Sequence, residues 1–144
     1  MGLIGTLFLW VFWPLFNFGV YAENTYERSA IIINTYCSLT GSTIGALIVT
    51  SIHGRGILVE DMQRSTLVGG VLIASSCEVI YFPAIALTIG FLGGIIATNL
   101  MHYLNRKVEK SLRILDPHAV HSTHGIPGLA GMIVSGILIM IYSS

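Results

Sequence analysis

Three histidines recur at every third position where an apolar segment without Lys, Arg, Asp or Glu begins: His118, His121 and His124, in residues 117–144. On a helix with about 3.6 residues per turn, that spacing keeps them within a sector of about 120°. An imidazole in a bilayer is costly unless it faces a cavity or a partner, so each is a candidate site residue. The pattern predicts that the three histidines face one space, with His124 the deepest.

Two kinds of chemistry could use these histidines. With Asp116 they resemble a set of metal ligands, but residues about two turns apart on a straight helix converge poorly on one ion. Asp116 followed by Pro117 is also typical of a helix start, with the carboxylate as the N-cap. A neutral imidazole has one nitrogen that donates and one that accepts, so it can pass a small polar molecule without holding charge. We therefore expect a pore, and we expect no metal, no other cofactor and no enzyme activity.

The composition indicates a multi-pass membrane protein. Only 10% of the residues are charged, against about 25% in a soluble domain, and the mean hydropathy is +0.79. A helix crosses the hydrocarbon with about 20 apolar residues, and Pro83 is expected to divide the long apolar stretch of residues 65–104. We predict an all-α fold with one membrane domain, residues 1–144, and no nucleic-acid partner. The five expected spans cover roughly residues 3–20, 29–52, 65–80, 83–104 and 118–142.

The basic residues predict how the chain is oriented. The second and fourth connections between the expected spans hold six of the seven Lys and Arg residues, and the first connection holds only Arg28. Cytoplasmic loops carry an excess of Lys and Arg. We therefore place the second and fourth connections in the cytoplasm, with the two ends of the chain on opposite faces.

Small residues form stripes that predict close packing between helices. Lipid tails provide no hydrophobic drive for helices to associate, so their backbones must approach each other through small side chains. The stripe in the second span is Ser38, Ser42, Ala46 and Thr50, with Gly41 and Gly45 beside it. The stripe in the fourth span is Ala86, Gly90, Gly94 and Thr98, and Gly69 and Gly70 lie in the third span. We expect packing at these positions, and no chemistry.

The first span has an aromatic cluster that is open to two interpretations. Trp13 and Phe16 could belong to an interfacial aromatic belt, or their rings could close a pore or hold a cation. Pro14 frees a backbone carbonyl, and the Asn17 amide near the apolar segment requires a partner.

Glu78 is the only acidic residue within an expected span. A buried carboxylate is expensive unless hydrogen-bond donors such as the preceding serines satisfy it. It could bond to backbone N–H groups at a helix end, or it could give an outer vestibule a negative potential that concentrates cations.

Four segments, taken together and in order, resemble the Rh glycoprotein branch of the ammonium transporter family. They are Gly5–Asn17, Asn34–Tyr36, Leu67–Val71 and Val120–Gly128. The resemblance covers nearly the whole chain, and it implies a trimer in which every subunit has a pore between two inverted halves of five helices. The chain is similar to the second of these halves.

The resemblance also implies roles for individual residues. His124, in the His-Gly-Ile-Pro-Gly motif, matches the pore histidine of the second half. Phe16 matches a phenylalanine that closes the outer mouth, Trp13 matches the tryptophan beside it, and His121 lies one turn nearer the cytoplasm. Val20 stands where members outside the Rh branch have a serine at an outer recruitment site, which favours permeation of ammonia over high-affinity capture of ammonium.

From the residues and the resemblance together, we expect a multi-pass protein of the plasma membrane that transports ammonia or ammonium and supplies one half of a pore. Its partners would be the lipid bilayer and the other chains of a homo- or hetero-trimer, including one that provides a first half. The alternative is a truncated paralogue that does not conduct and acts as an interaction or assembly subunit.

Overall fold

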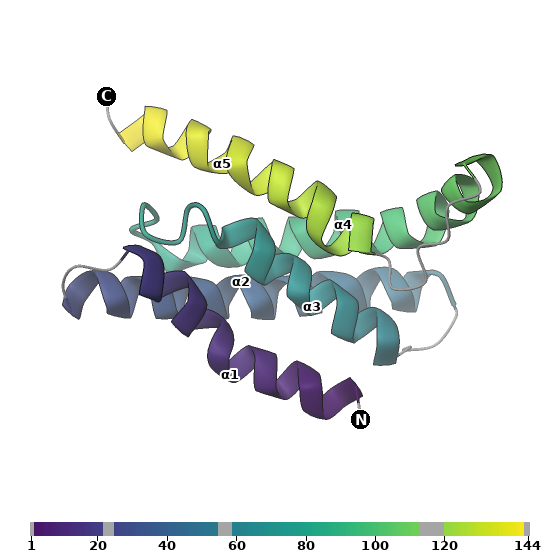
Figure 1. Cartoon of the computed structure of the whole chain (residues 1–144), viewed down its shortest axis with the longest axis horizontal. Coiled ribbons are helices and arrows are strands. Elements are labelled where there is room, and N and C mark those ends of the chain that lie inside the picture. The colour runs from purple at the N-terminus through teal and green to yellow at the C-terminus, as the bar shows by residue number, and fades with distance from the viewer. Residues whose placement is uncertain (1, 22–24, 55–58, 113–119, 143–144) are drawn as a thin grey trace.

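The structure is a computed structural model that describes residues 2–21, 25–54, 59–112 and 120–142. All of its regular elements in these ranges are helices, which confirms the expected all-α fold (Figure 1). They are α1 (Gly2–Tyr21), α2 (Thr25–Ile52), α3 (Val59–Ile73), α4 (Pro83–Leu112), a π-helical turn η1 (His121–Gly125) and α5 (Ile126–Tyr142).

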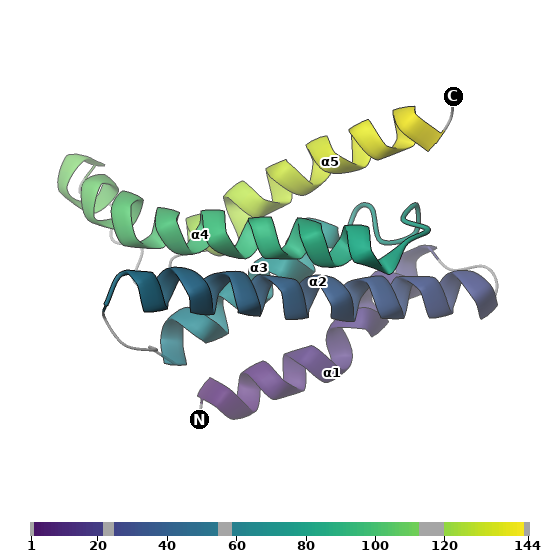
Figure 2. The same cartoon turned by 180° about the vertical axis from the view of Figure 1, so that it is seen from behind.

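The helices form two layers. In Figure 1, α1, α3 and α5 lie in front, with α3 between the other two. Figure 2, seen from behind, has α2 and α4 side by side in front. The helices that carry the predicted pore residues therefore share the layer formed by α1, α3 and α5.

Within the part of the chain that the structure describes, three helical segments are long and apolar enough to cross a membrane: Thr25–Ile52, Pro83–Tyr103 and His121–Tyr142, the last formed by η1 and α5. Gly2–Asn17 of α1 is a shorter apolar helix, and α3 has 15 residues. The expectation of five spans remains a prediction, because length and composition mark only three such segments among the described residues.

The tightest packing joins α2 to α4 through the small-residue stripes. A Cβ added at Gly41 would collide with the backbone of α4 at Leu87, and one added at Gly94 would collide with the backbone of α2 at Ser42. Gly45 and Gly90 make equivalent contacts. The two backbones therefore touch, as the stripes predict.

Hydroxyl groups of α2 attach α3 to this pair. Ser38 Oγ donates to the carbonyl oxygen of Gly69 at 2.8 Å, and Ser42 Oγ donates to that of Ser65. A Cβ at Gly69 would lie 2.5 Å from Ser38 O. Side chains of α2 thus bond directly to the backbone of α3, and these groups are buried.

The third helix ends earlier than the expected boundary at residue 80. α3 stops at Ile73, and turns connect it to Pro83, where α4 begins. Non-helical backbone at membrane depth must be satisfied by protein groups. The buried Asn34 does this, because its Nδ2 donates to Cys77 O at 2.9 Å and to Ile80 O at 2.8 Å. The apolar run to residue 80 is therefore a helix followed by a turn that α2 stabilises.

Gly90 provides a test of the contact between α2 and α4. Because the added Cβ collides with backbone that cannot rotate away, Gly90→Ala should lower the stability by about 1–3 kcal/mol. Gly136→Ala is the matched control, since its Cβ meets nothing within 4 Å and alanine favours a helix by about 1 kcal/mol over glycine. Thermal unfolding in detergent should give opposite shifts for the two variants. Equal shifts would mean that α2 and α4 are not in backbone contact.

Candidate functional site

His124 lies on the π-helical turn that begins α5. The N–H of Ile126 donates to His121 O, five residues back, where an α-helix would bond four residues back. Pro127 follows and has no N–H to offer the carbonyl of Thr123, which an α-helix would use. Single π-turns are frequent at functional sites. The regular α-helical spacing assumed for the histidines is therefore wrong between His121 and His124.

The two described histidines of this turn are both exposed, but they have different surroundings. Nδ1 of His124 lies 2.8 Å from the hydroxyl oxygen of Thr123. The ring of His121 lies beside Gly125, with Nδ1 3.4 Å from where a Cβ of residue 125 would stand. The imidazoles of His121 and His124 thus each have a local contact that limits their orientation.

Three residues of α1 were candidates, and each has a distinct environment. Phe16 is 68% exposed. The ring of Trp13 packs directly on Gly70 of α3, where a Cβ would overlap it. Asn17 is buried and its Nδ2 donates to Thr35 Oγ1 at 3.0 Å, so the amide has the partner that its position requires. Trp13 and Asn17 fix α1 against α3 and α2, while the ring of Phe16 stays accessible.

α1 and α5 flank α3 on opposite sides (Figure 1). A Cβ at Gly131 would lie 2.6 Å from Leu72 O, and Ser135 Oγ donates to Ser75 O at 2.7 Å. These two contacts fix α5 on the end of α3. The helix that carries the predicted aromatic residues and the segment that carries the predicted histidines thus belong to one layer, and both pack on α3.

Glu78 lies on the turn that follows α3, and its side chain is exposed. It borders a cavity of about 420 Å³ together with Tyr26, Glu27 and Tyr81. A carboxylate in this place can act on the electrostatic potential of the cavity. Asp116 and His118 lie outside the described residues.

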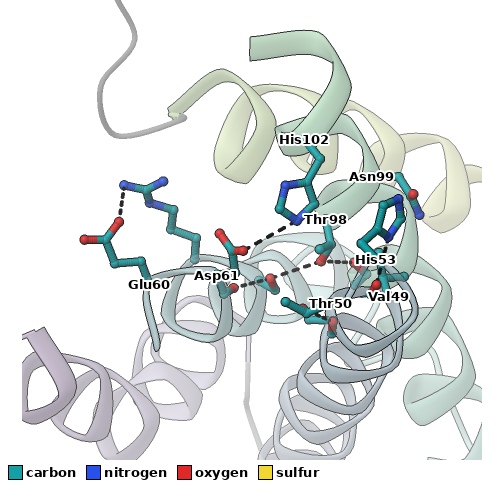
Figure 3. Close-up of polar contacts among 12 residues, drawn as sticks. Val49, Thr50, His53, Glu60, Asp61, Thr98, Asn99 and His102 are labelled. Carbon is teal, nitrogen blue, oxygen red and sulfur yellow. Dashed lines mark hydrogen bonds and ion pairs between the residues drawn. The ribbon is translucent and has the colours of Figure 1, made fainter. Parts of the chain in front are cut away.

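Sequence analysis missed a polar cluster at the other end of the α2, α3 and α4 bundle (Figure 3). Asp61 is 8% exposed, and its Oδ2 lies 3.5 Å from His102 Nε2. The ring of His53 stacks on that of His102 with 5.7 Å between centroids. Ser65 Oγ and Thr98 Oγ1, 3.2 Å apart, extend the polar contacts between α3 and α4.

No local pattern could have identified this cluster. Asp61 is in the first turn of a helix, where an acidic residue is ordinary. His102 lies near the end of the expected span of residues 83–104, shortly before basic residues, which is equally ordinary. Only the packing of α3 on α4 brings the carboxylate to the imidazole.

Comparison with known proteins identifies relatives of the whole chain. A sequence profile described as the Ammonium Transporter Family matches residues 1–144. "Ammonium transporter Rh type C" of Rattus norvegicus is 42% identical over an alignment of 145 positions, which covers 99% of this chain and 29% of the relative. The protein of the same name from Homo sapiens is 41% identical over 138 residues, 94% of this chain and 28% of the relative. The chain thus spans less than a third of the length of the relatives that it matches.

Solved structures give the same result for the fold. The structure of Nitrosomonas europaea Rh50, described as one of a family of channels, superposes with a TM-score of 0.85 at 30% identity over 93% of this chain and 35% of that one. A structure described as a sensor Amt protein gives a TM-score of 0.81 at 29% identity over 93% of this chain and 32% of that one. The arrangement of α1 to α5 is therefore that of a segment of these proteins.

The buried pair of Asp61 and His102 can be compared with an exposed pair one residue away. Asp61→Ala should destabilise the bundle by about 1–3 kcal/mol, because it removes a buried polar partner. Glu60→Ala breaks only the exposed contact with Arg64, so the loss should be about 0–1 kcal/mol. Thermal unfolding of both variants in the same detergent measures the difference. An Asp61→Ala loss no greater than that of Glu60→Ala would contradict the role of Asp61 in joining α3 to α4.

Proposed function

This chain belongs to the Ammonium Transporter Family, and from that membership we propose that it supplies one wall of an Rh-type pore for ammonia. The observation that carries the proposal is His124, an accessible imidazole on an irregular turn within an uncharged apolar segment. Accessible ionisable groups in such segments mark substrate paths. The names of the Rh type C relatives supply the substrate class, which is ammonium.

In the proposed pore, different residues act at the outer mouth and along the path of ammonia. Phe16, with Trp13 beside it, closes the outer mouth, where ammonium loses its proton. His124 and then His121 present neutral imidazole edges along which ammonia passes before it is protonated again inside. Because deprotonation of ammonium is uphill at neutral pH, contacts suited only to a neutral molecule select ammonia over potassium.

Three further residues support this path. Asn17 holds the end of α1 through Thr35. Glu78 lends negative potential to an outer vestibule. Asp116 begins the segment that carries the histidines.

The second wall of the pore comes from another set of helices, in a trimer in the plasma membrane. The layer of α1, α3 and α5 exposes large apolar side chains that a second half would cover, among them Phe8 at 63% and Met132 at 66%. The same exposed apolar surface supports a second candidate as well, a non-conducting subunit that uses it for assembly.

His124→Asp tests the pore. We expect a fixed negative charge in the path to favour the cation and to raise the potassium-to-ammonia flux ratio about tenfold, equivalent to about 1.4 kcal/mol. The chain would be joined to the N-terminal part of the Rattus norvegicus relative, reconstituted in proteoliposomes and assayed under a fixed pH gradient. His121→Ala should change the ratio less, and Phe16→Ala should weaken selectivity without abolishing flux.

The same ratio for the wild type and for His124→Asp would mean that the imidazole is a packing residue and that the pore is misassigned. Ammonia flux no greater than that of empty liposomes would favour the assembly subunit.

The orientation can be tested by cysteine labelling in intact cells. With Cys37 and Cys77 replaced by serine, Arg55→Cys and Arg106→Cys should react only from the cytoplasm, because basic loops lie inside. Asn24→Cys should react from outside. Reaction of Arg106→Cys with an impermeant reagent in intact cells would overturn the arrangement.

A further inference from the structure

The indole of Trp13 lies against α3 at a position that has no side chain. A Cβ added at Gly70 would overlap Nε1 and Cε2 of the indole and would lie 2.9 Å from its Cζ2. Glycine allows such a close approach because it has no Cβ. The missing side chain at position 70 therefore sets how near the ring of Trp13 lies to the backbone of α3.

Both helices that meet at this contact are also bonded to α2. On α3, Gly69 lies against α2, where an added Cβ would be 2.5 Å from Ser38 O, and Ser38 Oγ donates to Gly69 O at 2.8 Å. On α1, Asn17 Nδ2 donates to Thr35 Oγ1 of α2 at 3.0 Å. A larger side chain at position 70 would therefore displace the indole rather than separate α1 from α3.

The displaced indole would move toward Phe16. Residues three apart on a helix are neighbours on its surface, and Trp13 and Phe16 have this spacing on α1. Trp13 is partly buried, whereas Phe16 is 68% exposed. Because the backbone at Gly70 already fills the α3 side, the open direction for the indole is the side of Phe16.

We propose that Gly70 is a positioning residue that acts through Trp13 and sets the width of the outer mouth. The consequence for transport rests on the proposed function, in which Trp13 and Phe16 lie at this mouth. With glycine at position 70 the indole stays on α3, and a small alkylammonium ion such as methylammonium enters as well as ammonium. A side chain at position 70 would move the indole into the mouth and exclude the larger ion.

Tryptophan fluorescence tests the position of the indole without any transport. The chain has two tryptophans, so Trp10→Phe leaves Trp13 as the only one. In lipid nanodiscs, Gly70→Ala should shift the Trp13 emission to longer wavelength and increase its quenching by acrylamide, because the ring leaves α3. Gly94→Ala is the matched control, since its Cβ overlaps the backbone of α2 at Ser42 and should leave this emission unchanged.

A double variant separates the effect of the ring from a general loss of packing. Phenylalanine lacks the part of the indole around Nε1, so Gly70→Ala with Trp13→Phe should recover most of the thermal stability that Gly70→Ala loses. Gly94→Ala and Trp13→Phe share no contact, so their effects should add. A double variant as unstable as Gly70→Ala, or an unchanged Trp13 emission in Gly70→Ala, would overturn the inference. If Gly70→Ala alone does not fold, recovery of folding in the double variant decides the question.

The effect on solute size is measured on the chain joined to the N-terminal part of the Rattus norvegicus relative. Gly70→Ala should lower the methylammonium-to-ammonia flux ratio at least about tenfold, the lower end of what one carbon is worth in a fitted site. Adding Trp13→Phe should restore the ratio, and Gly94→Ala should not change it. An unchanged ratio with a displaced indole would refute the control of solute size. Absence of ammonia flux from the wild type would refute the proposed function, and the fluorescence would still decide the position of the indole.

Discussion

The contact between the backbones of α2 and α4 is the constraint on which the other contacts depend. In lipid, two helices gain nothing by hiding apolar side chains from water, so they must gain from close approach. Gly41 and Gly94 allow this approach from the two sides of the interface. A side chain at either position would hold these two helices apart.

Ser38 illustrates how one residue joins three helices. Its backbone lies against Gly90 of α4, and its hydroxyl bonds to Gly69 O of α3. In the apolar core of the bundle such a bond has no water to compete with it. The same arrangement allows an irregular turn after α3, since Asn34 of α2 satisfies two carbonyl groups there. The close packing of α2 and α4 thus permits a non-helical turn after α3.

The sequence predicted those features that depend on residue type at a fixed spacing. The stripe that contains Gly90 and Gly94 repeats along one helix face, and Pro83 cannot continue a helix, so both could be recognised locally. The end of α3 at Ile73 could not, because no glycine or proline follows before Pro83 and only Asn34, far away in sequence, stabilises the turn.

The candidate site divides in the same way. The need of Asn17 for a partner was visible in the sequence, and Thr35 meets it. The π-turn at His121–Gly125 was not visible, since Pro127 alone would equally suit the first turn of a new α-helix. The pair of Asp61 and His102 joins two helices whose register no local pattern contains.

The position of His124 follows from this hierarchy of contacts. α5 is fixed through Gly131 on Leu72 and Ser135 on Ser75. Those two anchors belong to α3 and to the turn that Asn34 stabilises, which in turn depend on α2. A change in the spacing of α2 and α4 would therefore reach His124 through α3, although neither helix carries a residue of the proposed path. The imidazole of His124 is exposed, but its position depends on buried contacts between α2 and α3.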